Sequence, residues 1–322
     1  MNDSGLTSGK PTPEIATLTP RDQPQATRMA GLFSLGVTLI VLLVLALMAS
    51  PPSALKTALN LPNVEFARIM AMIPHSIGFW AIFAAYYLAA PFTEWLIYYR
   101  LWHLPFSGMG ALLRKMVSNE LLLGYLGEVQ FYAWARARLN MVAAPFGAIK
   151  DVTILSALTG NMATLAMLGF AWPLVSSGKL GMETELIFKS LGVVLVTSFV
   201  ILLFRQRLFS LPRRQLVLVT LVHFARIFGI VGLAALMWHH ILPDVPYALW
   251  LVLATLRMLV SRLPLIPNKD VVFAGLAVFL MGHDAEIADL MTMMAGLLLI
   301  AHVVVGTVFG AAELINSRKD GG

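Results

Sequence analysis

The chain has 322 residues, of which 58% are hydrophobic and 12% are charged, with a mean hydropathy of +0.79. Soluble domains carry about a quarter charged residues, so this composition indicates a polytopic membrane protein. The formal charge of +6 lies mostly in short segments between apolar runs, which indicates membrane topology rather than nucleic-acid binding. The chain has no cysteine, which excludes disulfides and thiolate chemistry.

The first 27 residues are polar and rich in Ser, Thr and Pro, which predicts a disordered cytoplasmic tail. After it, several apolar runs approach or exceed the ~20 residues that a bilayer crossing needs. These runs are 31–49, 73–98, 153–175, 186–204, 216–237 and 288–314. They predict one all-α transmembrane domain, 28–315, followed by a short cytoplasmic tail, 316–322.

Clusters of Lys and Arg occur at alternate ends of these runs. The clusters comprise Arg28, then Arg100, Arg114 and Lys115, then Arg136, Arg138 and Lys150, then Arg205, Arg207, Arg213 and Arg214, and finally Arg318 and Lys319. Because cytoplasmic loops carry the excess of basic residues, we expect all of these clusters on the cytoplasmic side. This arrangement puts both termini inside the cell, in a multi-pass protein of the cytoplasmic (inner) membrane.

Two apolar segments, 112–146 and 248–282, do not fit as single crossings without breaking the charge pattern. Each is therefore predicted to be a re-entrant helical hairpin, one entering from each side of the membrane. Pro264 and Pro267 cannot continue a helix and would turn the second hairpin. Gly124 and Gly127 would turn the first. The alternative is eight ordinary crossings, one or two of them short.

The two hairpins lie in matching surroundings. Each is flanked by two apolar runs, which gives units of about 100 residues, 73–175 and 216–314, with opposite orientations. Inverted units with broken helices are typical of secondary transporters, in which the substrate site lies near the membrane midplane.

Ionisable residues inside membrane segments are costly and are usually functional. In the first hairpin, Glu120, Gly124, Glu128, Tyr132 and Arg136 recur every four residues, which predicts one helical face. Glu128 is predicted to begin the returning half of the hairpin and, with Arg136, to contact substrate. The simpler interpretation is that the two glutamates only pair with nearby basic residues.

The second hairpin brings further charge towards mid-membrane. Arg257, Arg262, Lys269 and Asp270 lie beside the expected half-helix end, where partial positive charge favours an anionic headgroup. The alternative is that the arginines extend outward and that Lys269 pairs with Asp270.

A separate set of polar residues in the predicted spans could form a proton relay or simply tie helices together. This set consists of Glu94, Glu120, His223 and Arg226. No nucleotide-binding loop, hydrolase elbow or zinc-binding spacing is present, so we expect no catalytic residue, cofactor or metal. The expected partner is a membrane lipid, with a homo-oligomer or complex partner left open and nucleic acid excluded.

The motifs "GYLGEVQF" (124–131) and "LIPNKDVVF" (265–273) lie in segments that resemble the flippase-like membrane region of lysylphosphatidylglycerol synthases and their stand-alone relatives. The resemblance covers about residues 73–314, and Gly127–Glu128 fills the place of the family's Gly-Glu pair. Asn268 and Lys269 replace the late glycines of the family, and its glutamate would fall near Phe273. The family's soluble aminoacyl-transfer domain is missing, so lipid aminoacylation is not expected.

Taken with the residues, the resemblance implies a lipid translocase that moves an anionic lipid headgroup across the cytoplasmic membrane. The residues also allow two alternatives. One is a membrane-embedded lipid-modifying enzyme, with Glu128 or the pair His283–Asp284 as acid and base. The other is a non-catalytic subunit of a membrane complex.

Overall fold

The computed structural model describes residues 66–121, 126–138, 144–176, 209–261, 269–281 and 284–320. The regular elements in these ranges are all helical, in agreement with the all-α part of the predicted fold class. The predicted apolar runs 31–49 and 186–204, the N-terminal tail, Arg262 and the prolines of the second hairpin lie outside the described residues.

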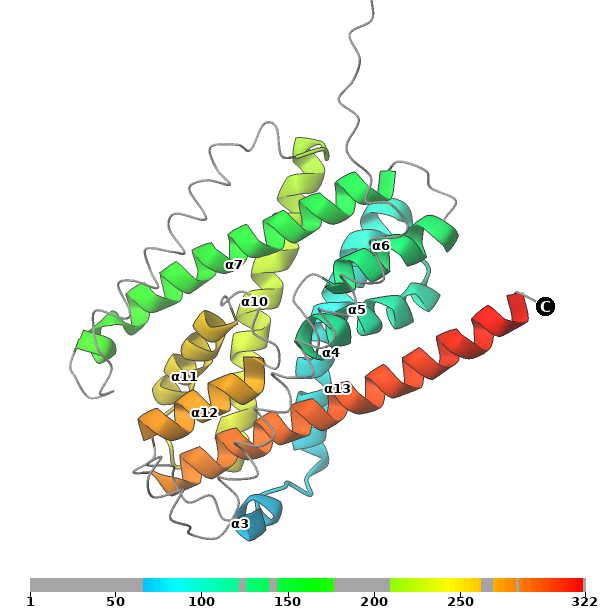
Figure 1. Cartoon of the computed structure of the whole chain (residues 1–322). Coiled ribbons are helices and arrows are strands. Elements are labelled where there is room, and N and C mark those ends of the chain that lie inside the picture. Colours follow the sequence, from blue (N-terminus) through cyan, green and yellow to red (C-terminus); the bar gives the residue numbers. More distant parts are fainter. Residues whose placement is uncertain are drawn as a thin grey trace, which may run out of the picture.

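Two long helices, α4 (Ile77–Trp102) and α10 (Arg213–Ile241), run antiparallel through the bundle (Figure 1). At one end, Ser76 caps α4 by accepting from the Phe79 amide at 3.2 Å, and its hydroxyl lies 3.0 Å from His240 Nε2 near the end of α10. At the other end, Val219 near the start of α10 packs in one apolar cluster with Tyr98 of α4. Contacts at both ends thus fix the pair in register.

A pair of short helices follows α4, and its members pack against each other: α5 (Met109–Leu121) and α6 (Leu126–Arg138). The expected single polar face from Glu120 to Arg136 is therefore wrong, because Glu120 lies in α5 and Glu128 lies in α6, and these two helices pack against each other. Gly127 has a different role from the predicted turn. It lies in the first turn of α6, where a Cβ would come within 2.2 Å of the Lys115 carbonyl oxygen, so glycine permits the close approach of α6 to α5.

A second pair of short helices follows α10, consisting of α11 (Tyr247–Val260) and α12 (Lys269–Met281). These two helices also pack against each other, and α11 contacts α10 just as α5 contacts α4. Trp238 of α10 stacks on Phe273 of α12, with ring centroids 6.1 Å apart. Each long helix is therefore followed by a packed pair of short ones.

A long helix completes each half of the described chain, α7 (Ala144–Ser176) after α6 and α13 (Ala285–Asp320) after α12. Contacts connect α7 with α6, α10 and α11, and connect α13 with α12, α5 and the short helix α3 (Phe66–Ala71). Helix α13 continues to Asp320, into the stretch predicted to be a tail.

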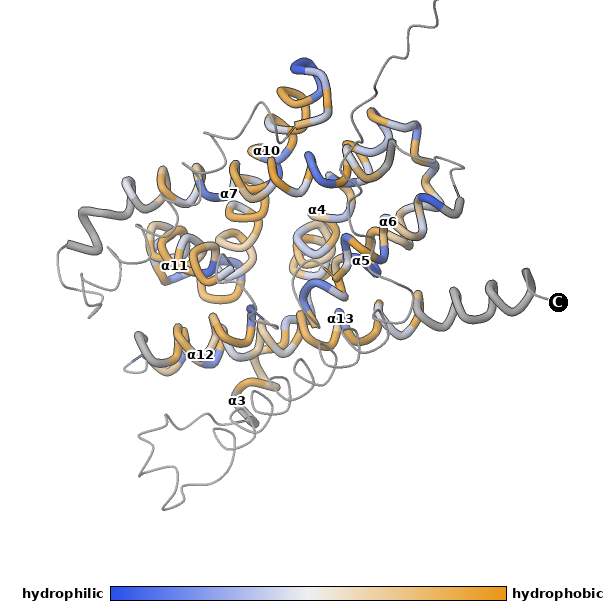
Figure 2. Tube along the Cα trace, turned by 45° about the horizontal axis from the view of Figure 1, so that its top comes forward, coloured by the Kyte–Doolittle hydropathy of each residue, from blue (hydrophilic) through white to orange (hydrophobic). Residues whose placement is uncertain are grey.

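Two helices among the described residues are long and apolar enough to cross a membrane, Arg213–Ile241 and Ala285–Phe309. The first contains all of the predicted run 216–237, and the second contains most of the predicted run 288–314. Apolar residues extend along most of both helices (Figure 2). In their most apolar windows only 22% and 28% of the residues are buried. Large apolar side chains are exposed along them, namely Val217, Leu221, Phe228 and Leu236 on α10 and Ile300, Val303, Val304 and Val308 on α13.

Candidate functional site

A cavity of about 290 Å³ lies between the two halves of the described bundle. Its walls come from α4, α5, α10, α11, α12 and α13, so both pairs of short helices contribute. The charged side chains of the lining are Glu120, Arg226, Arg257, Lys269 and Asp270. Ligand sites are usually concave, largely apolar and furnished with a few polar groups, which is the character of this lining.

Arg257 and Asp270 form the closest charged contact of the cavity. The Nε of Arg257 donates to Asp270 Oδ1 at 2.6 Å, and its Nη2 contacts the same oxygen. The guanidinium also lies over the ring of Tyr86, 5.3 Å from the centroid, which is a cation–π arrangement. The arginine of α11 is thus held between the first turn of α12 and an aromatic ring of α4.

Further polar groups from distant parts of the chain line the cavity beside this pair. Glu120 comes from the end of α5 and Lys269 from the start of α12. The Tyr87 hydroxyl lies 3.0 Å from His302 Nδ1, which joins α4 to α13. Tyr87 and His302 also line the cavity, so a hydrogen bond between two long helices borders the site.

Arg226 lines the cavity and also contacts residues outside the cavity lining. Its Nη2 donates to the Ser156 hydroxyl of α7 at 2.7 Å, and its Nη1 lies 3.7 Å from Glu94 Oε1 of α4. Its side chain is 12% exposed. One guanidinium therefore connects the cavity to a second polar cluster deeper among α4, α5, α6 and α7.

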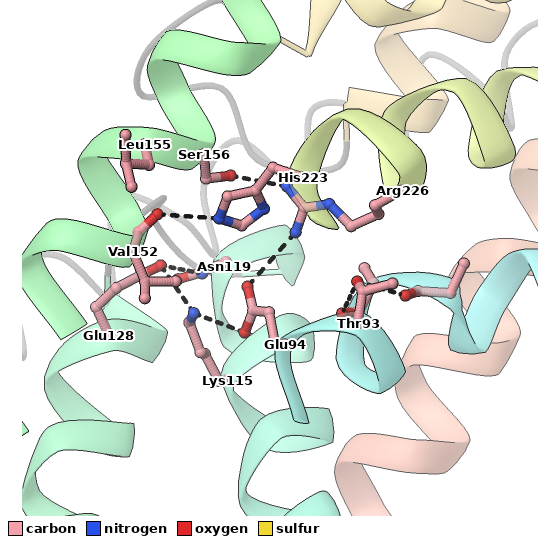
Figure 3. A network of polar contacts seen from close by, with 12 residues as sticks. Thr93, Glu94, Lys115, Asn119, Glu128, Val152, Leu155, Ser156, His223 and Arg226 are labelled. Carbon is pink, nitrogen blue, oxygen red and sulfur yellow. Dashed lines mark hydrogen bonds and ion pairs between the residues drawn. The ribbon is translucent and has the colours of Figure 1, made fainter. Parts of the chain in front are cut away.

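Lys115 is the centre of this second cluster (Figure 3). Its Nζ lies 2.8 Å from Glu94 Oε2 and 3.4 Å from Glu128 Oε1. Asn119 donates to Glu128 Oε1 at 3.3 Å and accepts from the Gly127 amide at 2.8 Å. The Lys115 side chain is only 4% exposed, so its charge depends on the two carboxylates for compensation.

His223 lies beside the cluster and is buried. Its Nε2 is 3.2 Å from the Val152 carbonyl oxygen of α7, and its Nδ1 has no hydrogen-bond partner among the described residues. The ring therefore ties α10 to α7, in agreement with the interhelical role that the sequence left open.

The structure brings most of the predicted site residues together. Glu120, Arg226, Arg257, Lys269 and Asp270 line the cavity, whereas Glu94 and Glu128 belong to the Lys115 cluster. Arg136 is exposed and lies outside the cavity lining. Asp270 pairs with Arg257 rather than with Lys269, as had been suggested. Glu128 contacts Lys115, one of the nearby basic residues with which the simpler interpretation paired it.

Sequence reasoning missed three contributors. Lys115 was expected only as one of a group of basic residues that fixes topology, yet it is buried between two carboxylates. Asn119 and Tyr86 carry no special sequence signal. The thirteen-residue separation of Arg257 and Asp270 recurs between Lys115 and Glu128, and this repeated spacing is the signal that could have identified Lys115.

The enzyme alternative involved Asp284, whose Oδ1 accepts from the Ile287 amide at 3.3 Å and so caps α13. Its suggested partner, His283, lies outside the described residues.

Comparisons with family models, curated proteins and solved structures give no match to this chain. The arrangement itself provides fixed cations, two of them guanidinium groups, in a cavity of small-molecule size. Such groups bind phosphate or carboxylate oxygens.

Proposed function

We propose that the chain is an integral protein of the cytoplasmic membrane in which α10 and α13 cross the bilayer. A helix in the core of a soluble protein would bury most of its apolar windows, but these two leave more than two thirds of theirs unburied. Exposed Leu and Val side chains in rows along α10 and α13 suit acyl chains better than water. The remaining predicted spans and the cytoplasmic position of both termini form part of this proposal.

We further propose that the two pairs of short helices are re-entrant hairpins in inverted units. The pattern of contacts supports this proposal. Helix α4 packs on α10; α5 packs on α4 and α13 as α11 packs on α10 and α7; and α6 packs on α7 as α12 packs on α13. Exchange of one unit for the other therefore reproduces these contacts, whereas the packing of α7 on α10 has no equally extensive counterpart between α13 and α4. The antiparallel course of α4 and α10 agrees with opposite orientations (Figure 1).

The function that this site supports best is translocation of a lipid by its phosphate-bearing headgroup, as in the flippase-like region that the sequence resembles. The observation that carries the proposal is the cavity in which Arg226, Arg257 and Lys269 meet between the two units. Its volume, about 290 Å³, is at the small end of ligand sites, which run from roughly 300 to 1,000 Å³. It therefore suits a headgroup, while the acyl chains stay in the bilayer.

Reconstitution into liposomes tests this function. Phosphatidylglycerol with a fluorophore on one acyl chain is placed in both leaflets, and dithionite then bleaches the outer leaflet from outside. We expect bleaching to proceed beyond the outer-leaflet fraction only in vesicles that contain the protein. The same final bleaching in protein-free vesicles would contradict the proposal.

A further inference from the structure

In its contact with Asp270, the guanidinium of Arg257 binds one carboxylate oxygen rather than two. Both Nε and Nη2 meet the same carboxylate oxygen, Oδ1. A guanidinium fork is shaped to hold two oxygens of one anion through parallel hydrogen bonds. A phosphate group supplies two such oxygens and therefore fits this fork better than the single carboxylate oxygen does.

The surroundings allow such a replacement. Arg257 and Asp270 both line the cavity, so a ligand there reaches both side chains. The ring of Tyr86 lies against the guanidinium and holds it in place when its carboxylate partner leaves. Lys269 and Arg226 line the same cavity and add positive charge for the incoming anion.

The first pair of short helices provides an internal comparison. Glu128 lies in the first turn of α6 as Asp270 lies in the first turn of α12, and each binds a cation thirteen residues earlier in the chain. Lys115, however, is 4% exposed and lies outside the cavity lining. The same kind of ion pair thus connects the two short helices in both halves, but only the pair in the second half is open to a ligand.

We propose that Asp270 holds the position on Arg257 that a phosphate group takes, so that ligand binding exchanges one anion for the other and releases the start of α12 from α11. This inference rests on the proposed headgroup site and assigns Asp270 a new role, as a competitor of the ligand rather than a contact to it. Exchange also gives the ligand a direct effect on the hairpin, because the ion pair that joins its two helices is the contact that the ligand replaces.

Binding to the full chain in maltoside detergent tests the exchange, with dihexanoylphosphatidylglycerol and inorganic phosphate as separate probes. Asp270→Asn removes the competing charge, so we expect it to bind phosphatidylglycerol roughly three- to tenfold more tightly than the wild type, as expected for loss of one partly buried ion pair. Arg257→Gln should bind more weakly. Asp244→Asn, on the exposed loop after α10, removes the same charge outside the cavity and should leave affinity unchanged.

A gain in Asp270→Asn for the lipid alone supports exchange by a lipid headgroup, and an equal gain for both probes supports exchange by any phosphate group. Unchanged or weaker binding in Asp270→Asn overturns the exchange, and so does an equal gain in Asp244→Asn. If either result overturns the exchange but Arg257→Gln still weakens binding, the proposed headgroup site is retained. If the wild type binds neither probe, the proposed function fails as well.

A measurement on the wild type covers the case in which Asp270→Asn does not fold. Hydrogen exchange of the backbone amides at the start of α12 should become faster when dihexanoylphosphatidylglycerol binds, because Asp270 no longer holds this turn to α11. A ligand that only adds contacts would slow exchange there, and slower or unchanged exchange overturns the proposal.

Discussion

Arg226 Nη1 lies 3.7 Å from Glu94 Oε1, and this contact connects the two polar regions of the molecule. Arg226 lines the cavity, whereas Glu94 binds Lys115 at 2.8 Å in the cluster between α4 and α5. At 3.7 Å the contact is a weak one, and Arg226 is held more closely by Ser156 at 2.7 Å. A phosphate group in the cavity can therefore engage Arg226 without breaking a strong ion pair.

Transport should depend on the cavity cations. Arg257→Gln removes the guanidinium fork, so we expect the rate of phosphatidylglycerol flipping in liposomes to fall at least about tenfold, the loss of one charge-assisted contact. Arg136→Gln is the matched control, because Arg136 is exposed and lies outside the cavity lining. Equal rates in the wild type and Arg257→Gln would mean that this charge serves only the ion pair with Asp270.

Membrane topology can be tested with single cysteines, because the natural chain has none. Ser210 precedes α10 and Asp244 follows it, and a helix of 29 residues is about 44 Å long, more than the ~30 Å of a bilayer core. We expect an impermeant maleimide added to intact cells to label a cysteine at position 244, and a cysteine at position 210 only after permeabilisation. Labelling of both from the same side would contradict a crossing by α10.

The sequence predicts where the helices of this fold lie better than it predicts which helices contact each other. The predicted apolar runs largely coincide with α4, α7, α10 and α13, as expected if a run long enough to cross a bilayer forms a helix. Of the glycines and prolines predicted to turn the short helices, Gly127 lies within α6, and Gly124, Pro264 and Pro267 lie outside the described residues. Periodicity within one helix, however, says nothing about which helix faces it, so the pairing of Asp270 with Arg257 rather than Lys269 could not be read from it.

The candidate site likewise combines residues that the sequence identifies with one that depends on packing between helices. The cost of charge in a membrane identifies Glu120, Arg226 and Arg257 as candidates, and all three line one cavity. Lys115 escapes this reasoning, because a lysine in a basic cluster is expected at the membrane surface. Its burial depends on Glu94, which lies 21 residues earlier on another helix. Only the packing of α5 on α4 brings that compensating charge to it.

The close approach of α6 to α5 should make Gly127 intolerant of any side chain. In Gly127→Ala the new Cβ would lie 2.2 Å from the Lys115 carbonyl oxygen and 2.8 Å from Asn119 Oδ1, so one helix must move. We expect a loss of about 1–3 kcal/mol in unfolding free energy, the usual cost of overpacking. Gly275→Ala in α12 is the control, since nothing lies within 4 Å of its new Cβ, and it should stabilise by about 0.5–1 kcal/mol. Thermal melts in detergent measure both, and equal melting temperatures for the two variants would contradict the tight contact.

Two roles are open for Glu128, one in stabilising the fold and one in coupling transport to protons. Its Oε1 contacts Lys115 and Asn119, while its Oε2 is buried without a hydrogen-bond partner among the described residues. Glu128→Gln keeps the shape but removes the charge beside buried Lys115, so we expect a loss of roughly 1–3 kcal/mol in unfolding free energy. Glu286→Gln changes an exposed first-turn glutamate of α13 and should cost less than about 0.5 kcal/mol.

The pH dependence of lipid flipping then decides between the two roles of Glu128. If its carboxylate only compensates Lys115, Glu128→Gln should melt earlier but flip lipid with the pH profile of the wild type. If the carboxylate couples flipping to protons, the variant should lose activity and also lose the pH dependence, because the titrating group has been removed. Flipping measured at several pH values, at a temperature where both proteins remain folded, separates these results. Wild-type stability, activity and pH profile together in Glu128→Gln would exclude Glu128 from both roles.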